Sequence, residues 1–148
     1  GDGSIALVGA FENDIGENFR QGAAYIFSGN GSIWTQQARL TASDGAAGDW
    51  FGYAVDLNNS GTTALIGAYA DDVGENHGQG SAYVFTGSGS TWSEVIQLTS
   101  PDGSVGDYFG ESVALKDNGI VGLIGPDIEP IGVGEFRSAA YIFNWTLP

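Results

Sequence analysis

The chain has 148 residues, and its 18 acidic side chains against 4 basic ones give a formal net charge of −14. That length suits one domain, and an apolar fraction of 42% is too high for a disordered chain. The scattered cations, the single histidine and the lack of cysteine argue against nucleic-acid binding, multi-histidine metal sites and thiolate chemistry, and no apolar run suggests membrane insertion.

Four short strands are predicted in the middle of the chain. In chain order they cover residues 51–57, 63–68, 81–85 and 91–98. Polar turns separate the first pair and the last pair, and a long polar loop joins the second strand to the third. Helical periodicity is absent, and the many glycines disfavour helices by about 1 kcal/mol per residue. The pattern predicts a four-stranded antiparallel meander.

The same pattern recurs at an interval of 58 residues without a gap. The matching segments are 7–10, 65–68 and 123–126, then 24–27, 82–85 and 140–143, then 48–52 and 106–110. A repeat of this length is one supersecondary unit that cannot bury its apolar faces alone and has to stack on its neighbours. We expect a partial repeat at residues 1–50, a complete one at 51–108 and a partial one at 109–148, within one region spanning 1–148.

Two glycine motifs in each period carry a family resemblance. Phe51-Gly52 precedes Gly67-Ala68, and Phe109-Gly110 precedes Gly125-Pro126. These pairs resemble the FG-GAP repeat, which builds the β-propeller of integrin α-subunits, and residues 40–52 are similar to its bacterial subtype. The resemblance implies an all-β fold of propeller blades.

The number of predicted strands falls short of a closed propeller. Three strands, then four, then three are expected, whereas a propeller needs 4–8 blades. Either the chain is a segment of a larger propeller, or copies of it associate to close the ring. The expected partners therefore include further blades from the same or another copy of the chain.

Three groups of acidic residues are candidates for calcium. The turn with Asp56, Asn58 and Ser60 resembles the integrin calcium loop, but Ala64 stands where that loop has an acid, which favours a plain polar turn. The other two groups repeat in the long loops and in the links between repeats. Their members are Asp14, Glu17, Asn18, Asp71, Asp72, Glu75 and Asn76, then Asp44, Asp49, Asp102 and Asp107. Each group could instead bond the backbone of its own turn, so no cofactor is required.

The aromatic residues divide into core and exposed candidates. Phe51 and Phe109 should wedge between neighbouring blades, where the following glycine allows close backbone approach. Trp34 and Trp92 are expected in the core, and Trp92, Ile96 and Leu98 should share one strand face. A sugar-stacking role for these tryptophans is the alternative. Trp50 and Tyr108 stand in loops before Phe-Gly and are the candidates for ligand contact.

These features favour a non-catalytic recognition or assembly module that is secreted or lies at the cell surface. The acids recur with the repeat, whereas an active site is normally built once, and the single His77 reads as a solvated side chain. Loops 11–21, 69–79 and 127–137 should emerge together and bind a protein or glycan partner. The alternatives are a propeller portion of a secreted polysaccharide-degrading enzyme and a structural subunit of a ring or filament.

Overall fold

A computed structural model describes residues 3–125, 129–132, 135–137 and 140–146, and these form antiparallel β-sheets. Sheet 1 contains β1 (Ile5–Ala10), β2 (Ala23–Asn30) and β3 (Ile33–Leu40) in that order. Sheet 2 contains β4 (Phe51–Leu57), β5 (Thr63–Ala68), β6 (Ser81–Ser88) and β7 (Thr91–Leu98). Sheet 3 has the order β12-β9-β8, with β8 (Ser112–Leu115), β9 (Val121–Gly125) and β12 (Tyr141–Asn144). None of the described residues forms a helix that could cross a membrane.

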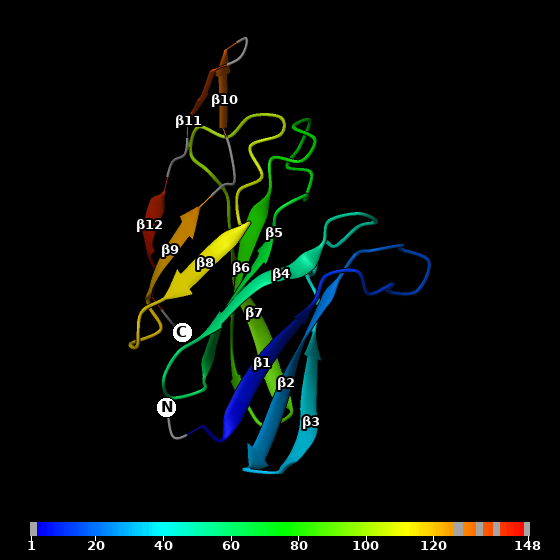
Figure 1. Cartoon of the computed structure of the whole chain (residues 1–148), viewed down its shortest axis with the longest axis vertical. Coiled ribbons are helices and arrows are strands. Elements are labelled where there is room, and N and C mark those ends of the chain that lie inside the picture. Colours follow the sequence, from blue (N-terminus) through cyan, green and yellow to red (C-terminus); the bar gives the residue numbers. More distant parts are fainter. Residues whose placement is uncertain (1–2, 126–128, 133–134, 138–139, 147–148) are drawn as a thin grey trace.

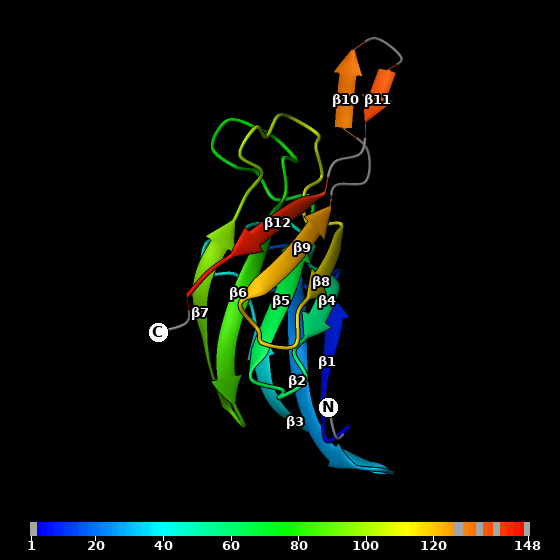
Figure 2. The ribbon, with the colours of Figure 1, turned by 90° about the vertical axis from the view of Figure 1, so that its left-hand side faces the viewer.

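Sheet 2 lies between the other two sheets, as Figures 1 and 2 show. One core cluster joins Ile26 of sheet 1 to Ile66 and Tyr83 of sheet 2. A second cluster joins Leu65 of sheet 2 to Ile124 of sheet 3. Because both of its faces are covered, β5 is buried along its whole length. The sheets therefore stack as propeller blades do, and they do not close into a ring.

Each Phe-Gly phenylalanine lies between two sheets, as the sequence predicts. Phe51 is 0% exposed, and its ring lies 5.5 Å from the ring of Tyr83, edge to face. Phe109 is also 0% exposed and lies 5.7 Å from Tyr141 in the same arrangement. Such aromatic pairs add to the free energy gained by burial. The same interface is thus built twice, once for each period.

The glycines allow the backbones of neighbouring sheets to meet. A Cβ atom on Gly9 would lie 1.9 Å from the carbonyl oxygen of Gly52, and one on Gly67 would lie 1.9 Å from that of Gly110. Gly52 also has a φ of +89°, which favours glycine. No larger residue fits this contact without moving the backbone.

The outer face of sheet 3 has no neighbouring sheet among the described residues. Leu65 and Val84 of sheet 2 are both 0% exposed because sheet 3 covers them. Their counterparts 58 residues later, Leu123 and Ile142, are 45% and 69% exposed. The apolar pattern of a stacked blade therefore continues onto a face that none of the described sheets covers.

Two details of the sequence prediction were wrong. The expected loop 127–137 contains a hairpin of β10 (Glu129–Gly132) and β11 (Glu135–Arg137), which raises the strand number above that predicted. A bulge in β7 shifts its pairing with β6, because Val84 of β6 pairs with Ile96 and the next residue, Phe85, pairs with Glu94. The extra residue in β7 breaks the alternation of that strand. As a result Trp92 packs in the first core cluster and Leu98 in the second, while Ile96 is 38% exposed.

Trp34 is also misplaced by the sequence prediction, because it is 42% exposed. Its ring lies over Gly29 of its own hairpin, and its Nε1–H donates to the Gly31 carbonyl oxygen at 3.2 Å. Trp92 makes the matching bond to Gly89 at 3.1 Å, but sheet 1 packs against it and leaves it half-buried. Each tryptophan covers a hairpin end, and only the second gains a neighbouring sheet.

Candidate functional site

Five aromatic side chains form a continuous surface across the three sheets, at the end where β1 and β5 finish. Ring centroids are 5.7 Å apart for Phe11 and Trp50, 5.2 Å for Trp50 and Tyr69, 4.4 Å for Tyr53 and Tyr69, and 5.7 Å for Tyr69 and Tyr108. Tyr53 and Tyr108 are each 40% exposed, and the other three are half-buried. We call these five residues the aromatic surface. Trp50 and Tyr108, the candidates from the sequence, lie in this row, with Tyr108 40% exposed and Trp50 half-buried, and ligand contact by either stays a prediction.

The backbone holds the two loop aromatics in an uncommon conformation. Trp50 has a φ of +58° and Tyr108 a φ of +55°, which bulky residues rarely adopt. The N–H of Trp50 donates to the Arg20 carbonyl oxygen at 3.2 Å, and that of Tyr108 to the Gly78 carbonyl oxygen at 3.1 Å. These bonds tie the start of one sheet to the loop of the preceding sheet. The interface between sheets therefore fixes where both rings point.

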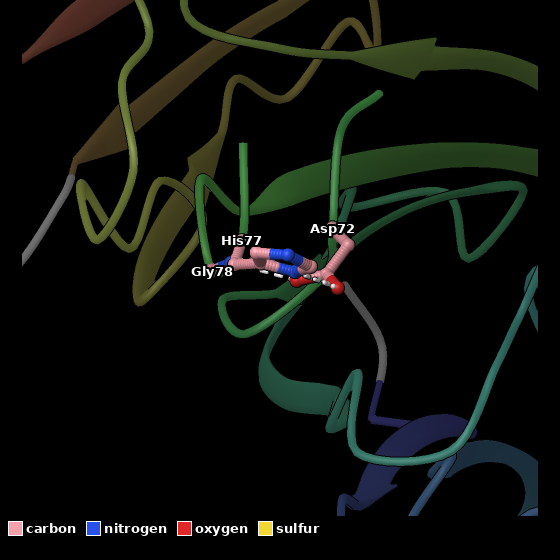
Figure 3. A network of polar contacts seen from close by, with 3 residues as sticks. All are labelled: Asp72, His77 and Gly78. Carbon is pink, nitrogen blue, oxygen red and sulfur yellow. Dashed lines mark hydrogen bonds and ion pairs between the residues drawn. The ribbon is translucent and has the colours of Figure 1, made fainter. Parts of the chain in front are cut away.

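The acids at the start of the long loops close those loops. Asp72 Oδ1 accepts the Gly78 N–H at 2.8 Å, and Asp14 Oδ1 accepts the Arg20 N–H at 2.8 Å in the matching loop. His77 Nδ1 lies 2.7 Å from Asp72 Oδ2 (Figure 3), and the histidine side chain is 80% exposed. These contacts lower the pKa of Asp72 below its usual value. The pair orders a loop and faces solvent.

The amides and glutamates of the same loops have separate roles. Asn18 Nδ2 donates to Gln21 Oε1 at 2.9 Å and to the Gly45 carbonyl oxygen at 3.2 Å. Asn76 makes the matching contacts at 2.8 Å and 3.3 Å. Glu17 and Glu75 are exposed at the loop tips. The asparagines thus fasten each loop to the following link, and the glutamates lie in solvent.

Tyr83 of β6 and Tyr141 of β12 occupy matching positions, and each bonds an acid in a link between repeats. Tyr83 Oη donates to Asp44 Oδ1 at 2.9 Å, and Tyr141 Oη donates to Asp102 Oδ1 at 2.6 Å. Asp71 lies beside Tyr83, 3.2 Å from its hydroxyl, and also accepts from Ser81 Oγ. Burial raises the pKa of Asp71 in spite of these bonds, and it raises the pKa of Tyr83 as well.

Asp49 and Asp107 are buried acids inside the links. Asp49 Oδ2 accepts the Ala46 N–H at 2.5 Å, and Asp107 Oδ2 accepts the Ser104 N–H at 2.5 Å. Burial is the main cause that raises the pKa of Asp49 to about 6, and the nearby Asp71 adds to it. Each of these acids therefore holds a turn that leads into Phe-Gly.

The structure shows no assembled cation site among the residues it describes. No group of three or more histidine, aspartate or glutamate side chains there could hold a metal ion. The turn after β4 is an ordinary polar turn, because Asn58 Oδ1 accepts the N–H groups of Thr62 and Thr63 at 2.9 Å and 3.0 Å. The two alternatives that the sequence leaves open for the acidic groups, a calcium site and a structural turn, both stay predictions.

The sequence analysis missed three members of the aromatic surface: Phe11, Tyr53 and Tyr69. Phe11 and Tyr69 occupy matching positions 58 residues apart, just past the strands β1 and β5. That recurrence of an aromatic residue was the available signal. Tyr53 has no aromatic counterpart, because Glu111 takes its place in the next period, so only the structure could find it.

The stacked meanders and their Phe-Gly contacts define a set of β-propeller blades. The FG-GAP repeat model matches residues 34–85 and 92–143, which together are more than half of the chain. The chain belongs to the FG-GAP repeat family.

Proposed function

We propose that this chain is a non-catalytic recognition module, secreted or displayed at the cell surface, that binds a protein partner through the aromatic surface. The single observation that carries the proposal is the row of five aromatic rings across three sheets, two of them 40% exposed. Aromatic residues are enriched at the centres of protein interfaces, where they supply contact area at low entropic cost.

The surroundings of the aromatic surface set the chemistry of the partner. Asp14, Asp72 and Glu75 lie in the adjoining loops and are exposed. The whole chain carries a net charge of −14. An aromatic centre with an acidic rim is complementary to an apolar patch bordered by lysine or arginine, and the charge would speed its encounter.

Two features support a non-catalytic role. The buried acids Asp49 and Asp107 occupy matching positions and bond turn backbones, which is a structural role repeated by the periods. The His77–Asp72 pair is exposed on a loop, and the matching loop has Phe19 in place of the histidine. Neither arrangement resembles a reaction centre that is built once.

The experiment pairs binding selection with matched variants. A display library of folded domains is selected on the chain, and the binders are measured against Tyr53→Ala/Tyr108→Ala and against Trp34→Ala. Trp34 is 42% exposed but lies outside the aromatic surface, so it controls for loss of an exposed ring.

We expect Tyr53→Ala/Tyr108→Ala to reduce the affinity for basic binders at least tenfold, and Trp34→Ala to leave that affinity unchanged. Melting curves confirm that both variants fold. Binders that ignore the double variant would contradict the proposal. A glycan array probed with the same variants provides the second arm, and glycan hits that need Tyr53 and Tyr108 would replace the protein partner by a glycan. Hydrolysis of a polysaccharide by the chain would refute the non-catalytic assignment.

A further inference from the structure

The composition of the chain directs oxidation to its aromatic side chains. The sequence contains no cysteine and no methionine, the sulfur residues that oxidants attack most readily in proteins. In such a chain the electron-rich rings of tyrosine and tryptophan are the next side chains to lose an electron. An oxidant that meets this protein therefore acts mainly on its 6 tyrosines and 4 tryptophans.

Three of the tyrosines lie ring to ring in the aromatic surface. The ring centroids of Tyr53 and Tyr69 are 4.4 Å apart, with 59° between the ring planes. The ring of Tyr69 is also 5.7 Å from that of Tyr108. The ring of Tyr83, by contrast, packs on Phe51. Of the two contacts between tyrosines, the one that joins Tyr53 to Tyr69 is the closer.

Neighbouring strands hold this pair together. Tyr53 belongs to β4, and Tyr69 directly follows the last residue of β5. Phe51 of β4 pairs with Ala68 of β5, so both tyrosines lie at the same end of sheet 2. The N–H of Tyr53 donates to the Trp50 carbonyl oxygen at 3.2 Å, which fixes the start of β4. Because the paired backbone already brings the two rings into contact, a bond between them needs no rearrangement of the sheet.

The surroundings of the pair suit the loss of electrons and protons. Tyr53 is 40% exposed, so its phenolic proton can pass to water. Tyr69 is half-buried, and the ring of Trp50 lies 5.2 Å from it. An oxidised indole takes an electron from a nearby tyrosine, so oxidation of either residue leaves a tyrosyl radical. A radical on Tyr69 then faces the ring of Tyr53 at contact distance.

We propose that Tyr53 and Tyr69 form an oxidative modification site, at which a haem peroxidase with hydrogen peroxide joins the two rings as dityrosine. Each ring loses one electron and its phenolic proton. The two radicals then form a carbon–carbon bond between ring carbons ortho to the hydroxyl groups, and the hydrogens on those carbons move to the oxygens and restore both phenols. The two electrons and two protons reduce one molecule of hydrogen peroxide to two of water.

The product is a covalent link between β4 and the start of loop 69–79. A cross-link restricts the unfolded chain and thereby favours the folded one. The reaction needs an oxidant and no binding partner, so this inference does not depend on the proposed function.

The experiment treats the whole chain, in dilute solution, with a haem peroxidase and hydrogen peroxide. The blue fluorescence of dityrosine measures the yield, and size separation distinguishes monomers from dimers. Asp56 lies between the two tyrosines, so cleavage at aspartate separates their peptides unless a bond joins them. We expect a fluorescent monomer in which mass spectrometry finds these two peptides joined with the loss of two hydrogen atoms. Its melting midpoint should lie above that of the untreated chain.

Phenylalanine variants identify the pair, because they keep the ring and remove the phenol. Tyr69→Phe should lower the yield of monomeric dityrosine at least tenfold, since Tyr69 takes part in both contacts. Tyr53→Phe leaves only the longer contact, with Tyr108, and should lower the yield at least threefold. Tyr108→Phe should leave the yield unchanged. Tyr25→Phe is the matched control, because Tyr25 is a half-buried residue of β2 outside the aromatic surface.

The absence of dityrosine, or its presence only in dimers, would overturn the proposal. Oxygen added to Tyr53 and Tyr69 without a bond between them would overturn it too. A product that is lost in Tyr108→Phe and kept in Tyr53→Phe would assign the link to Tyr69 and Tyr108 and would also contradict the proposed site. Melting curves of the untreated variants verify that each one folds.

Discussion

Replacing Phe51 by alanine should remove a large part of the stability of the chain. The side chain is 0% exposed and packs on Tyr83 and on Phe85, with ring distances of 5.5 Å and 5.9 Å. It also belongs to the cluster that joins sheets 1 and 2. Truncation of a buried phenylalanine costs about 3–5 kcal/mol, from lost burial and from the cavity left behind. At the central value of about 4 kcal/mol, the melting temperature should fall by about 8–16 °C.

Denaturant unfolding of Phe51→Ala measures this loss directly, and two further variants test its cause. Phe109→Ala should lose a similar amount, because Phe109 is 0% exposed and has the same ring contacts with Tyr141 and Phe143. Phe19→Ala is the matched control: Phe19 is 60% exposed, and its truncation should cost less than about 0.5 kcal/mol. A loss below about 1 kcal/mol for Phe51→Ala, or equal losses for all three, would refute the repeated interface.

Three further predictions follow from the glycine contacts, the buried acid and the loop carboxylates. Gly67→Ala places a Cβ atom 1.9 Å from a backbone oxygen and should destabilise the chain strongly in denaturant unfolding. Gly74→Ala has open space and should show only the smaller cost of its positive φ. Asp49 holds its proton more tightly in the folded state, with a pKa of about 6 against 3.8, so its contribution to stability falls as pH rises from about 4 to about 6. This pKa difference corresponds to about 3 kcal/mol in the free energy of unfolding. Between pH 7 and pH 4, the melting midpoint should therefore rise less for Asp49→Asn than for the parent chain. The loop carboxylates are occupied by N–H groups, so adding calcium and then EDTA should leave the melting midpoint unchanged; a midpoint that rises with calcium would show a cation site instead.

The repeated core could be predicted from the sequence because each period carries the same signals. The strands 51–57, 63–68 and 91–98 were placed at their observed bounds, since turn residues flank short apolar or alternating runs. The burial of Phe51 and Phe109 was also predictable, because a phenylalanine directly before a glycine recurs at the same place in two periods.

Other features depended on tertiary context. The bulge in β7 leaves no distinctive residue type, and it moved Leu98 to the opposite face from Trp92. Trp34 and Trp92 have the same local sequence role, and only the presence of a neighbouring sheet decides how much of each is exposed. The aromatic surface joins one strand residue, Tyr53, to four loop residues that adjoin the three sheets, so its members could be suspected singly and assembled only in three dimensions.

Hydrogen exchange along the whole chain tests most directly whether neighbouring sheets cover one another. The β5 amides (Thr63–Ala68) lie in a strand with paired edges and covered faces, so they should exchange slowest. The matching amides of β1 (Ile5–Ala10) and β9 (Val121–Gly125) should exchange faster, because no described strand pairs with the outer edge of β1 and no described sheet covers the outer face of sheet 3. Equal protection of the three strands would contradict the stacked arrangement.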